Sequence, residues 1–139
     1  MIDTETLSSR IGNLRGYLEK LTTLAVVSKE EFLREFTYIE SAKHLLQVSI
    51  ESCLDIAHHI VAEEGYRTPT DYYDTFVVLY ENKILPENFM PSLRQMVGFR
   101  NRLVHLYWDV GSEAIYQILQ ENLGDFEVFV KLILDSFKP

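Results

Sequence analysis

The chain has 139 residues, 47% of them apolar, and a formal net charge of −8 from 13 basic and 21 acidic residues. This length fits one domain over residues 1–139, with a hydrophobic core that needs no disulfide or metal. An acidic chain does not favour broad wrapping of nucleic acid, because such binding needs many phosphate contacts. We therefore expect any nucleic-acid chemistry to be confined to a small, locally basic cleft.

No signal peptide is visible at the start of the chain, and no stretch approaches the roughly 20 apolar residues of a membrane span. Cys53 is the single cysteine, which indicates a reducing compartment and a small buried side chain. We expect a cytoplasmic protein that has no membrane partner.

Helical periodicity dominates the first half of the chain. Leucine and isoleucine at spacings of three and four predict an amphipathic helix over about 4–24. Ser28 followed by Glu31 is a capping-box pattern. It predicts a second helix over about 29–63, long enough that we expect a kink before Ser41.

The second half continues the helical pattern, with clear punctuation between elements. Gly65 is expected to cap the long helix. A short helix then covers about 71–82, another covers about 87–107, and Gly111 precedes a last helix over about 113–137. The predicted fold is an all-α bundle of about five helices.

The expected helix over 87–107 carries a polar cluster in the run FRNRLVHLYW. On a helical wheel, Arg100 lies near the middle of the apolar stripe, whereas Arg102 points to the solvent side. Asn101 and His105 share one flank. Arg100 is therefore the unusual residue of the cluster.

A guanidinium directed at a core is costly unless it is paired or opens onto a wet cleft. Arg100 is thus either in an ion pair with an acid on a neighbouring helix or an anion-binding group at a cleft or subunit interface. A lone helical histidine such as His105 is usually a boundary residue. The two side chains are about 140° apart on an ideal helix, so they converge only through the length of the arginine or with a second subunit.

A second line of polar residues on the long helix consists of Glu51, Asp55 and His59, spaced by four. These side chains either flank the motif, where an acid pairs its arginine or orients its histidine, or form a solvated face with i,i+4 pairs. His58 and His59 point about 100° apart, and no third ligand has a recognisable spacing. We expect no metal and no cofactor.

The run RNRLVH has the arginine–four residues–histidine pattern of the HEPN superfamily, and HLY extends it to the HxY form. Within that superfamily the chain resembles the HepT-like toxins, small all-α proteins partnered with a minimal nucleotidyltransferase antitoxin. The resemblance covers most of the chain, including the helix HLLQVSIESCLDIAHHIV and the segment YWDVGSEAIYQIL after the motif.

The resemblance implies a homodimer whose two motifs face each other in a composite site. It implies a metal-independent RNA endonuclease that acts on transfer RNA and not on DNA. His105 then serves as general acid or base around the ribose 2′-hydroxyl and the leaving oxygen. Arg100 holds the scissile phosphate, for which its planar fork is suited, and Asn101 orients one of these groups.

In this family the antitoxin transfers AMP to the tyrosine of the HxY motif, which corresponds to Tyr107. The modification would place phosphate bulk and negative charge beside the motif and block RNA. On the wheel Tyr107 lies almost in line with Arg100. The alternative from periodicity alone is a boundary aromatic with its hydroxyl in water.

Two other interpretations stay open. In the first, the chain is a non-catalytic helical interaction domain that binds a nucleotidyltransferase or a nucleotide and cleaves nothing. In the second, Arg100 and His105 are structural ion-pair residues. The intact arginine–histidine pair favours the ribonuclease, because a scaffold needs neither residue.

Overall fold

The computed structural model of the protein describes residues 2–137, which form seven α-helices, two short 3-10 helices and no strand. The predicted all-α fold is confirmed. In chain order the elements are α1 (Thr4–Ala25), α2 (Lys29–Arg34), α3 (Phe36–Glu64), α4 (Tyr72–Glu81), η1 (Glu87–Phe89), α5 (Met90–His105), η2 (Tyr107–Asp109), α6 (Ser112–Glu121) and α7 (Gly124–Ser136).

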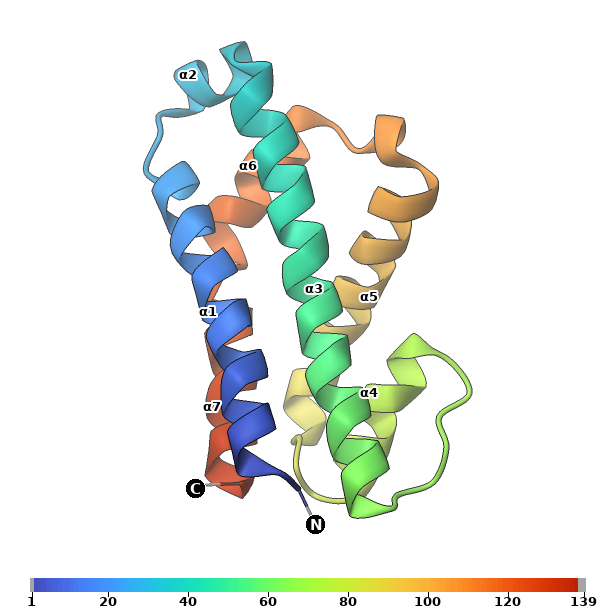
Figure 1. The fold of residues 1–139 in the computed structure, drawn as a ribbon. Coiled ribbons are helices and arrows are strands. Elements are labelled where there is room, and N and C mark those ends of the chain that lie inside the picture. Colours follow the sequence, from blue (N-terminus) through green and yellow to red (C-terminus); the bar gives the residue numbers. More distant parts are fainter. Residues whose placement is uncertain (1, 138–139) are drawn as a thin grey trace.

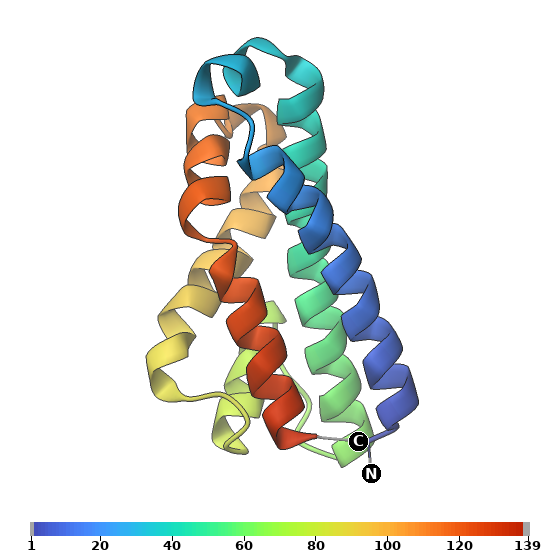
Figure 2. The ribbon, with the colours of Figure 1, turned by 90° about the vertical axis from the view of Figure 1, so that its left-hand side faces the viewer.

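Helix α3 is the centre of the bundle and contacts each of the other six α-helices. It runs the length of the molecule between α1 and α5, and α4 packs beside its C-terminal half (Figure 1). Helices α6 and α7 follow one another along the bundle in the second view (Figure 2). No helix in the described part of the chain is both long enough and apolar enough to cross a membrane.

The predicted apolar stripe of the first helix is confirmed. Asp3 caps α1 by accepting hydrogen bonds from the backbone N–H groups of its first turn. The buried residues of α1 are Leu7, Ile11, Leu14, Leu18 and Leu21. The predicted C-cap is also confirmed, because Gly65 ends α3 in the left-handed conformation at φ 70°.

The expected helix over 29–63 is divided at Glu35, whose backbone is extended at φ −108° and ψ 107°. The break lies before Ser41, as the length of the segment suggested, but it separates two helices. Phe32 of α2 is fully buried and packs against the rings of Tyr38 and Tyr116. Through these contacts α2 packs against α3 and α6.

The expected helix over 113–137 is wrong as one element, because the chain breaks between α6 and α7. Asn122 ends α6 and Gly124 opens α7. Both residue types are poor helix formers. The break allows Ile115 of α6 and Phe126 of α7 each to lie in the core.

The helix that carries the motif is shorter than predicted. It ends at His105, and Leu106 leaves the helical conformation at φ −134° and ψ 46°. Tyr107 therefore begins the 3-10 helix η2 and is not on α5. The wheel alignment of Tyr107 with Arg100 is wrong, since it extrapolated α5 past its end.

Candidate functional site

Arg100 lies on the core-facing side of α5. Its side chain is only 14% exposed. Neighbouring turns of α5 bury Met96, Val97 and Leu103 of the predicted stripe. Val104, which the helical period also places on that stripe, is instead 40% exposed. Arg102 is exposed, also as expected. The arginine therefore needs partners inside the bundle.

The partners of Arg100 come from three elements. Its Nε and Nη2 atoms donate to one oxygen of Glu51 on α3, at 3.1 and 2.9 Å. Its Nη1 donates to Oδ1 of Asn101 at 3.2 Å. The guanidinium carbon lies 4.9 Å from the centroid of the Tyr72 ring, at the start of α4. One carboxylate thus neutralises the arginine, and an aromatic ring covers part of its face.

His105 occupies a different environment at the C-terminal end of α5. Its side chain is exposed. Among residues 2–137, no hydrogen bond or ion pair joins its ring to Arg100, whose polar partners are Glu51 and Asn101.

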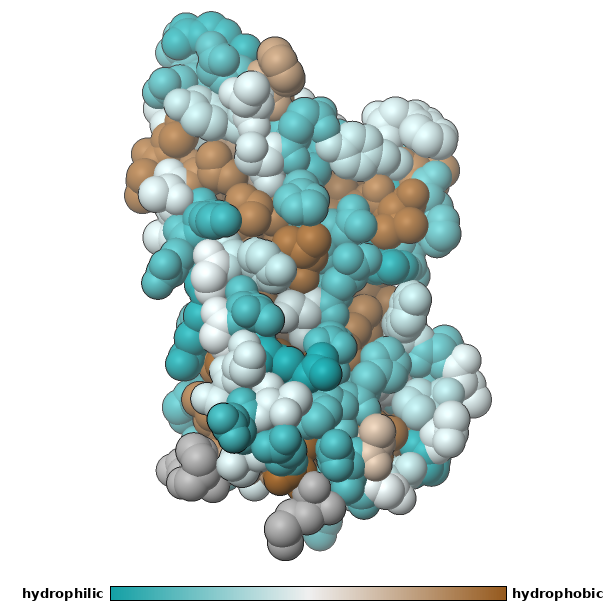
Figure 3. Space-filling model, in the orientation of Figure 1, coloured by the Kyte–Doolittle hydropathy of each residue, from teal (hydrophilic) through white to brown (hydrophobic). Residues whose placement is uncertain are grey.

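Exposed apolar side chains precede and follow His105 in the chain. Trp108 is 77% exposed, and Val104 and Leu106 are also exposed. Brown, hydrophobic side chains are visible over the C-terminal part of α5 in Figure 3. The exposed histidine therefore has exposed apolar neighbours along the chain.

Tyr107 is held by two residues of α3, Glu40 and Lys43, that no motif or spacing in the sequence marks. Its hydroxyl donates to the carboxylate of Glu40. Lys43, which is buried, places Nζ 4.4 Å from the centroid of the ring and donates to the Tyr107 carbonyl at 3.3 Å. Burial, and then the hydrogen bond and charge of Glu40, raise the pKa of Tyr107 to about 12.

Of the three polar residues expected beside the motif, Glu51 contacts Arg100. Asp55 instead pairs with Arg10 of α1. His59 is half-buried, and its Nε2 has no hydrogen-bond partner among the described residues. Successive turns of α3 thus contact different helices, since Glu51 pairs with α5 and Asp55 pairs with α1. Glu51, Asp55 and His59 do not form one cluster.

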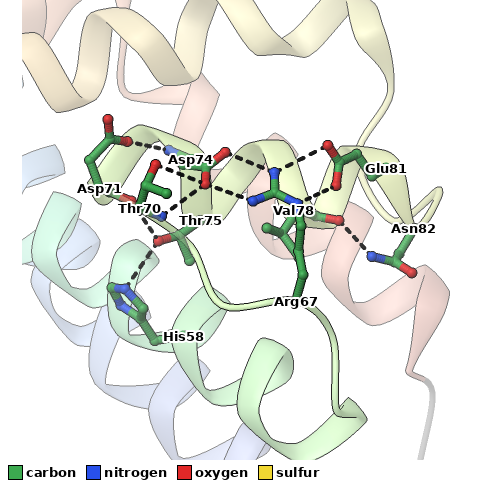
Figure 4. A network of polar contacts seen from close by, with 9 residues as sticks. All are labelled: His58, Arg67, Thr70, Asp71, Asp74, Thr75, Val78, Glu81 and Asn82. Carbon is green, nitrogen blue, oxygen red and sulfur yellow. Dashed lines mark hydrogen bonds and ion pairs between the residues drawn. The ribbon is translucent and has the colours of Figure 1, made fainter.

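A polar network fixes the loop before α4 and the helix itself (Figure 4). The guanidinium of Arg67 binds both Asp74 and Glu81. It holds the pKa of the Asp74 carboxyl well below its usual range. Asp71 caps α4 through the backbone N–H of Asp74, and Thr75 bonds the His58 ring at 3.0 Å.

The remaining features of the described residues lie apart from these contacts. A cavity of about 280 Å³ lies between α3, α5, α6 and α7, and Arg102 is one of the residues that line it. No group of three or more histidine, cysteine or acidic side chains within residues 2–137 is arranged to hold a metal ion.

Comparison with known proteins gives a consistent match. Residues 14–133 match the family described as ribonuclease HepT-like. The mRNA nuclease HepT of Shewanella oneidensis is 33% identical over 103 residues, which are 74% of this chain and 77% of that protein. The tRNA nuclease HepT of Aphanizomenon flos-aquae is 24% identical over 95% of this chain and 90% of that protein.

A solved structure with the same fold is a tri-AMPylated HEPN toxin of Shewanella oneidensis in complex with its MNT antitoxin. It is 27% identical, its TM-score is 0.84, and the match covers 93% of this chain and 96% of that one. The sequence resemblance through Arg100, Asn101 and His105 thus coincides with a match over most of the chain. The chain belongs to the HepT-like ribonuclease family of HEPN proteins.

Proposed function

We propose that the protein is an RNA endonuclease toxin that AMP transfer by a nucleotidyltransferase antitoxin neutralises. The family match and the names of the two nuclease relatives support this activity. The observation that carries the proposal is made on the motif helix α5. There Arg100 forms an ion pair with one carboxylate, and His105 is exposed with no hydrogen-bond partner among residues 2–137.

The chemistry needs a base, an acid and an anion-binding group. The imidazole of His105 removes the proton of a ribose 2′-hydroxyl as that oxygen attacks the phosphorus. The bond from phosphorus to the 5′-oxygen breaks, and this leaving oxygen takes a proton from the imidazolium or from water. The guanidinium of Arg100 binds the non-bridging oxygens and stabilises their growing charge, and Asn101 orients the guanidinium. These side chains need no metal for this chemistry.

We place the working site between two copies of the chain. Within one chain Arg100 faces α3 and α4, whereas His105 points to solvent at the end of α5. Val104, Leu106 and Trp108, which precede and follow the histidine in the chain, are exposed, and an exposed apolar surface commonly marks an interface. A two-fold dimer buries this surface and brings the His105 of one copy to the Arg100 of the other.

The proposed modification site is Tyr107. Its hydroxyl lies against Glu40, and a phosphodiester formed on that oxygen carries a negative charge. Repulsion from the carboxylate then drives the modified side chain away from α3. The added nucleotide blocks the approach of RNA to the motif. The AMPylated toxin in complex with its antitoxin, cited above, supports this mode of neutralisation.

The first test is cleavage of transfer RNA by purified protein in excess EDTA. Wild-type protein is expected to cleave, and Arg100→Ala and His105→Ala are expected to lose about 10²- to 10⁴-fold in rate. Arg102→Ala, on the solvent side of the same helix, is the matched control and retains activity. Cleavage that needs a metal, or equal cleavage by all variants, contradicts the proposal.

The second test is the intact mass of the protein after co-expression with a minimal nucleotidyltransferase. One or more AMP units are expected on wild-type protein and none on Tyr107→Phe. AMP on the phenylalanine variant contradicts the assignment of Tyr107. AMP on Tyr107 of a protein that cleaves no RNA identifies a binding module, the alternative from the sequence.

A further inference from the structure

The ring of Tyr72 is the aromatic neighbour of the motif arginine. Tyr72 is the first residue of α4 and packs on the guanidinium of Arg100. It is nevertheless 44% exposed. Part of the ring thus faces solvent directly beside the group to which we assign phosphate binding.

Residues before and after Tyr72 in the chain hold its ring in position. Asp71 accepts a hydrogen bond from the Asp74 backbone at 2.7 Å, which anchors the turn before Tyr72. Thr75, one turn later, bonds the ring of His58 on α3 at 3.0 Å. These contacts belong to the network of Figure 4. The His58 ring also meets the Tyr72 ring edge-on, with centroids 6.4 Å apart, so the tyrosine is held in place before any ligand binds.

We propose that Tyr72 is a stacking platform for the base of the nucleotide whose phosphate binds Arg100. This proposal rests on the RNA cleavage proposed above. A nucleotide carries its phosphate and its base on one ribose, so a cation and an aromatic ring in contact are placed to bind both. Aromatic side chains stack on bases in this way in proteins that bind single strands.

The platform defines the class of substrate. A base that stacks on Tyr72 has left its own helix, so the cleaved nucleotide is unpaired, in a loop, a bulge or a single-stranded end. Every base has a π-face, so stacking itself selects little among base types. The site therefore selects for RNA structure at the cleavage position more strongly than for sequence.

The chain provides a matched control in the next residue. Tyr73 packs on Arg94, also on α5, with the guanidinium carbon 4.0 Å from the ring centroid. Tyr73 is less exposed than Tyr72, and Arg94 lies outside the motif. The same type of contact thus occurs twice, and only one of the two adjoins the proposed site.

The test compares Tyr72→Leu, Tyr72→Phe, Tyr72→Trp and Tyr73→Leu in steady-state cleavage of transfer RNA. It also measures their binding to a 2′-O-methyl oligoribonucleotide, which lacks the attacking hydroxyl. Tyr72→Leu is expected to raise KM and the Kd of the oligonucleotide roughly 5- to 100-fold, with kcat within about twofold. Tyr72→Phe and Tyr72→Trp keep an aromatic face and are expected to recover most of the binding that Tyr72→Leu loses. Tyr73→Leu, outside the proposed site, is the control that is expected to bind as wild type does.

The second measurement locates the contact directly. Irradiation with a single-stranded oligoribonucleotide that contains 4-thiouridine is expected to crosslink the tryptic peptide 68–83 at Tyr72. The same base inside a duplex stem is expected to give no crosslink. Equal binding by wild type and Tyr72→Leu, a fall in kcat alone, or equal crosslinking of the duplex would overturn the platform. The 2′-O-methyl ligand is not cleaved, so its binding can be measured whether or not the protein cleaves RNA. Weaker binding by Tyr72→Leu supports stacking in either case. A wild-type protein that cleaves no RNA would refute only the proposed function.

Discussion

Arg67 and Arg100 show how one residue type has two different roles in the same molecule. Arg67 donates to two carboxylates, to Asp74 at 2.8 and 2.9 Å and to Glu81 at 2.8 and 3.1 Å. Arg100 donates to a single carboxylate oxygen, that of Glu51, and its face lies on an aromatic ring. Arg67, with one positive charge, therefore lies between two negative charges. The charge of Arg100 is neutralised by one carboxylate.

The difference decides which arginine is suited to bind a phosphate. The two acids around Arg67 repel an incoming anion, and their hydrogen bonds occupy its planar fork. At Arg100 a phosphate has to displace one carboxylate from the guanidinium or share the guanidinium with it. The Arg67 network therefore stabilises the loop before α4, whereas Arg100 is poised for exchange of its partner.

The largest expected effect is a difference in kcat/KM between the same substitution, arginine to lysine, made at Arg100 and at Arg67. Arg100→Lys keeps the charge but loses the planar fork, and it is expected to lower kcat/KM for RNA by about 100-fold. Arg67→Lys is expected to change kcat/KM by less than about threefold, because an ammonium group can still pair with one acid. Steady-state cleavage measures both, and equal effects of the two substitutions would remove the distinction.

A smaller effect is expected when the acid beside Arg100 is neutralised. Glu51→Gln keeps an acceptor for the guanidinium but removes a negative charge that competes with phosphate. We expect KM for RNA to fall by about tenfold, with the strongest gain at low salt. Glu81→Gln, beside Arg67, is the control and leaves KM unchanged. A rise in KM of Glu51→Gln would mean that the acid positions the arginine and does not compete.

Glu40 is a further acid on α3, and its partner is a phenol. Glu40→Gln is expected to lower the pKa of Tyr107 from about 12 toward its ordinary value of 10.0, because the amide does not repel the phenolate. The pKa is raised in the folded state, so the stabilising contribution of Tyr107 is complete below pH 10.0 and lost as pH rises to about 12. The ¹³C shift of labelled tyrosine measures the titration. An unchanged pKa in the variant would leave burial as the whole cause.

The smallest expected effect concerns the stability of the Arg67 network. Asp74→Asn is expected to lower Tm at neutral pH by a few degrees at most, since its partner Arg67 is 44% exposed and solvent screens the pair. Arg67 depresses the pKa of Asp74 below 3.8, so its contribution is present above that pH and lost as pH falls through the depressed value. The Tm difference between wild type and variant should therefore shrink in acid. A difference that is constant from neutral to acid pH would show that the charge of Asp74 does not matter.

The sequence predicted those parts of the fold that local chemistry determines. The stripe of α1 and the cap at Gly65 follow from residue spacing and from backbone freedom at glycine. The break at Glu35 carries no glycine or proline, and the burial of Phe32 accounts for it. Asn122 and Gly124 are poor helix formers at the second break. Apolar residues continue at helical spacing on both sides of them, however, so the sequence predicted one continuous helix.

For the candidate site, the helical wheel identified Arg100 as an arginine on the core-facing side and Glu51 as one of its possible partners. It failed at Tyr107, because no residue type at Leu106 marks the end of α5. The contacts of Glu40 and Lys43 with Tyr107, like that of Tyr72 with Arg100, join distant parts of the chain. Such contacts depend on how helices cross, which spacing along one helix does not report.

In the proposed dimer, each site combines Arg100 of one copy with His105 of the other. The most direct measurement is the cleavage rate of a mixed dimer in which one copy carries Arg100→Ala and the other His105→Ala, purified through two different tags. In the proposed arrangement both substitutions fall in one site, and the second site is intact. The mixed dimer is therefore expected to cleave at about half of the wild-type rate. A mixed dimer as inactive as either variant alone would contradict the proposed arrangement.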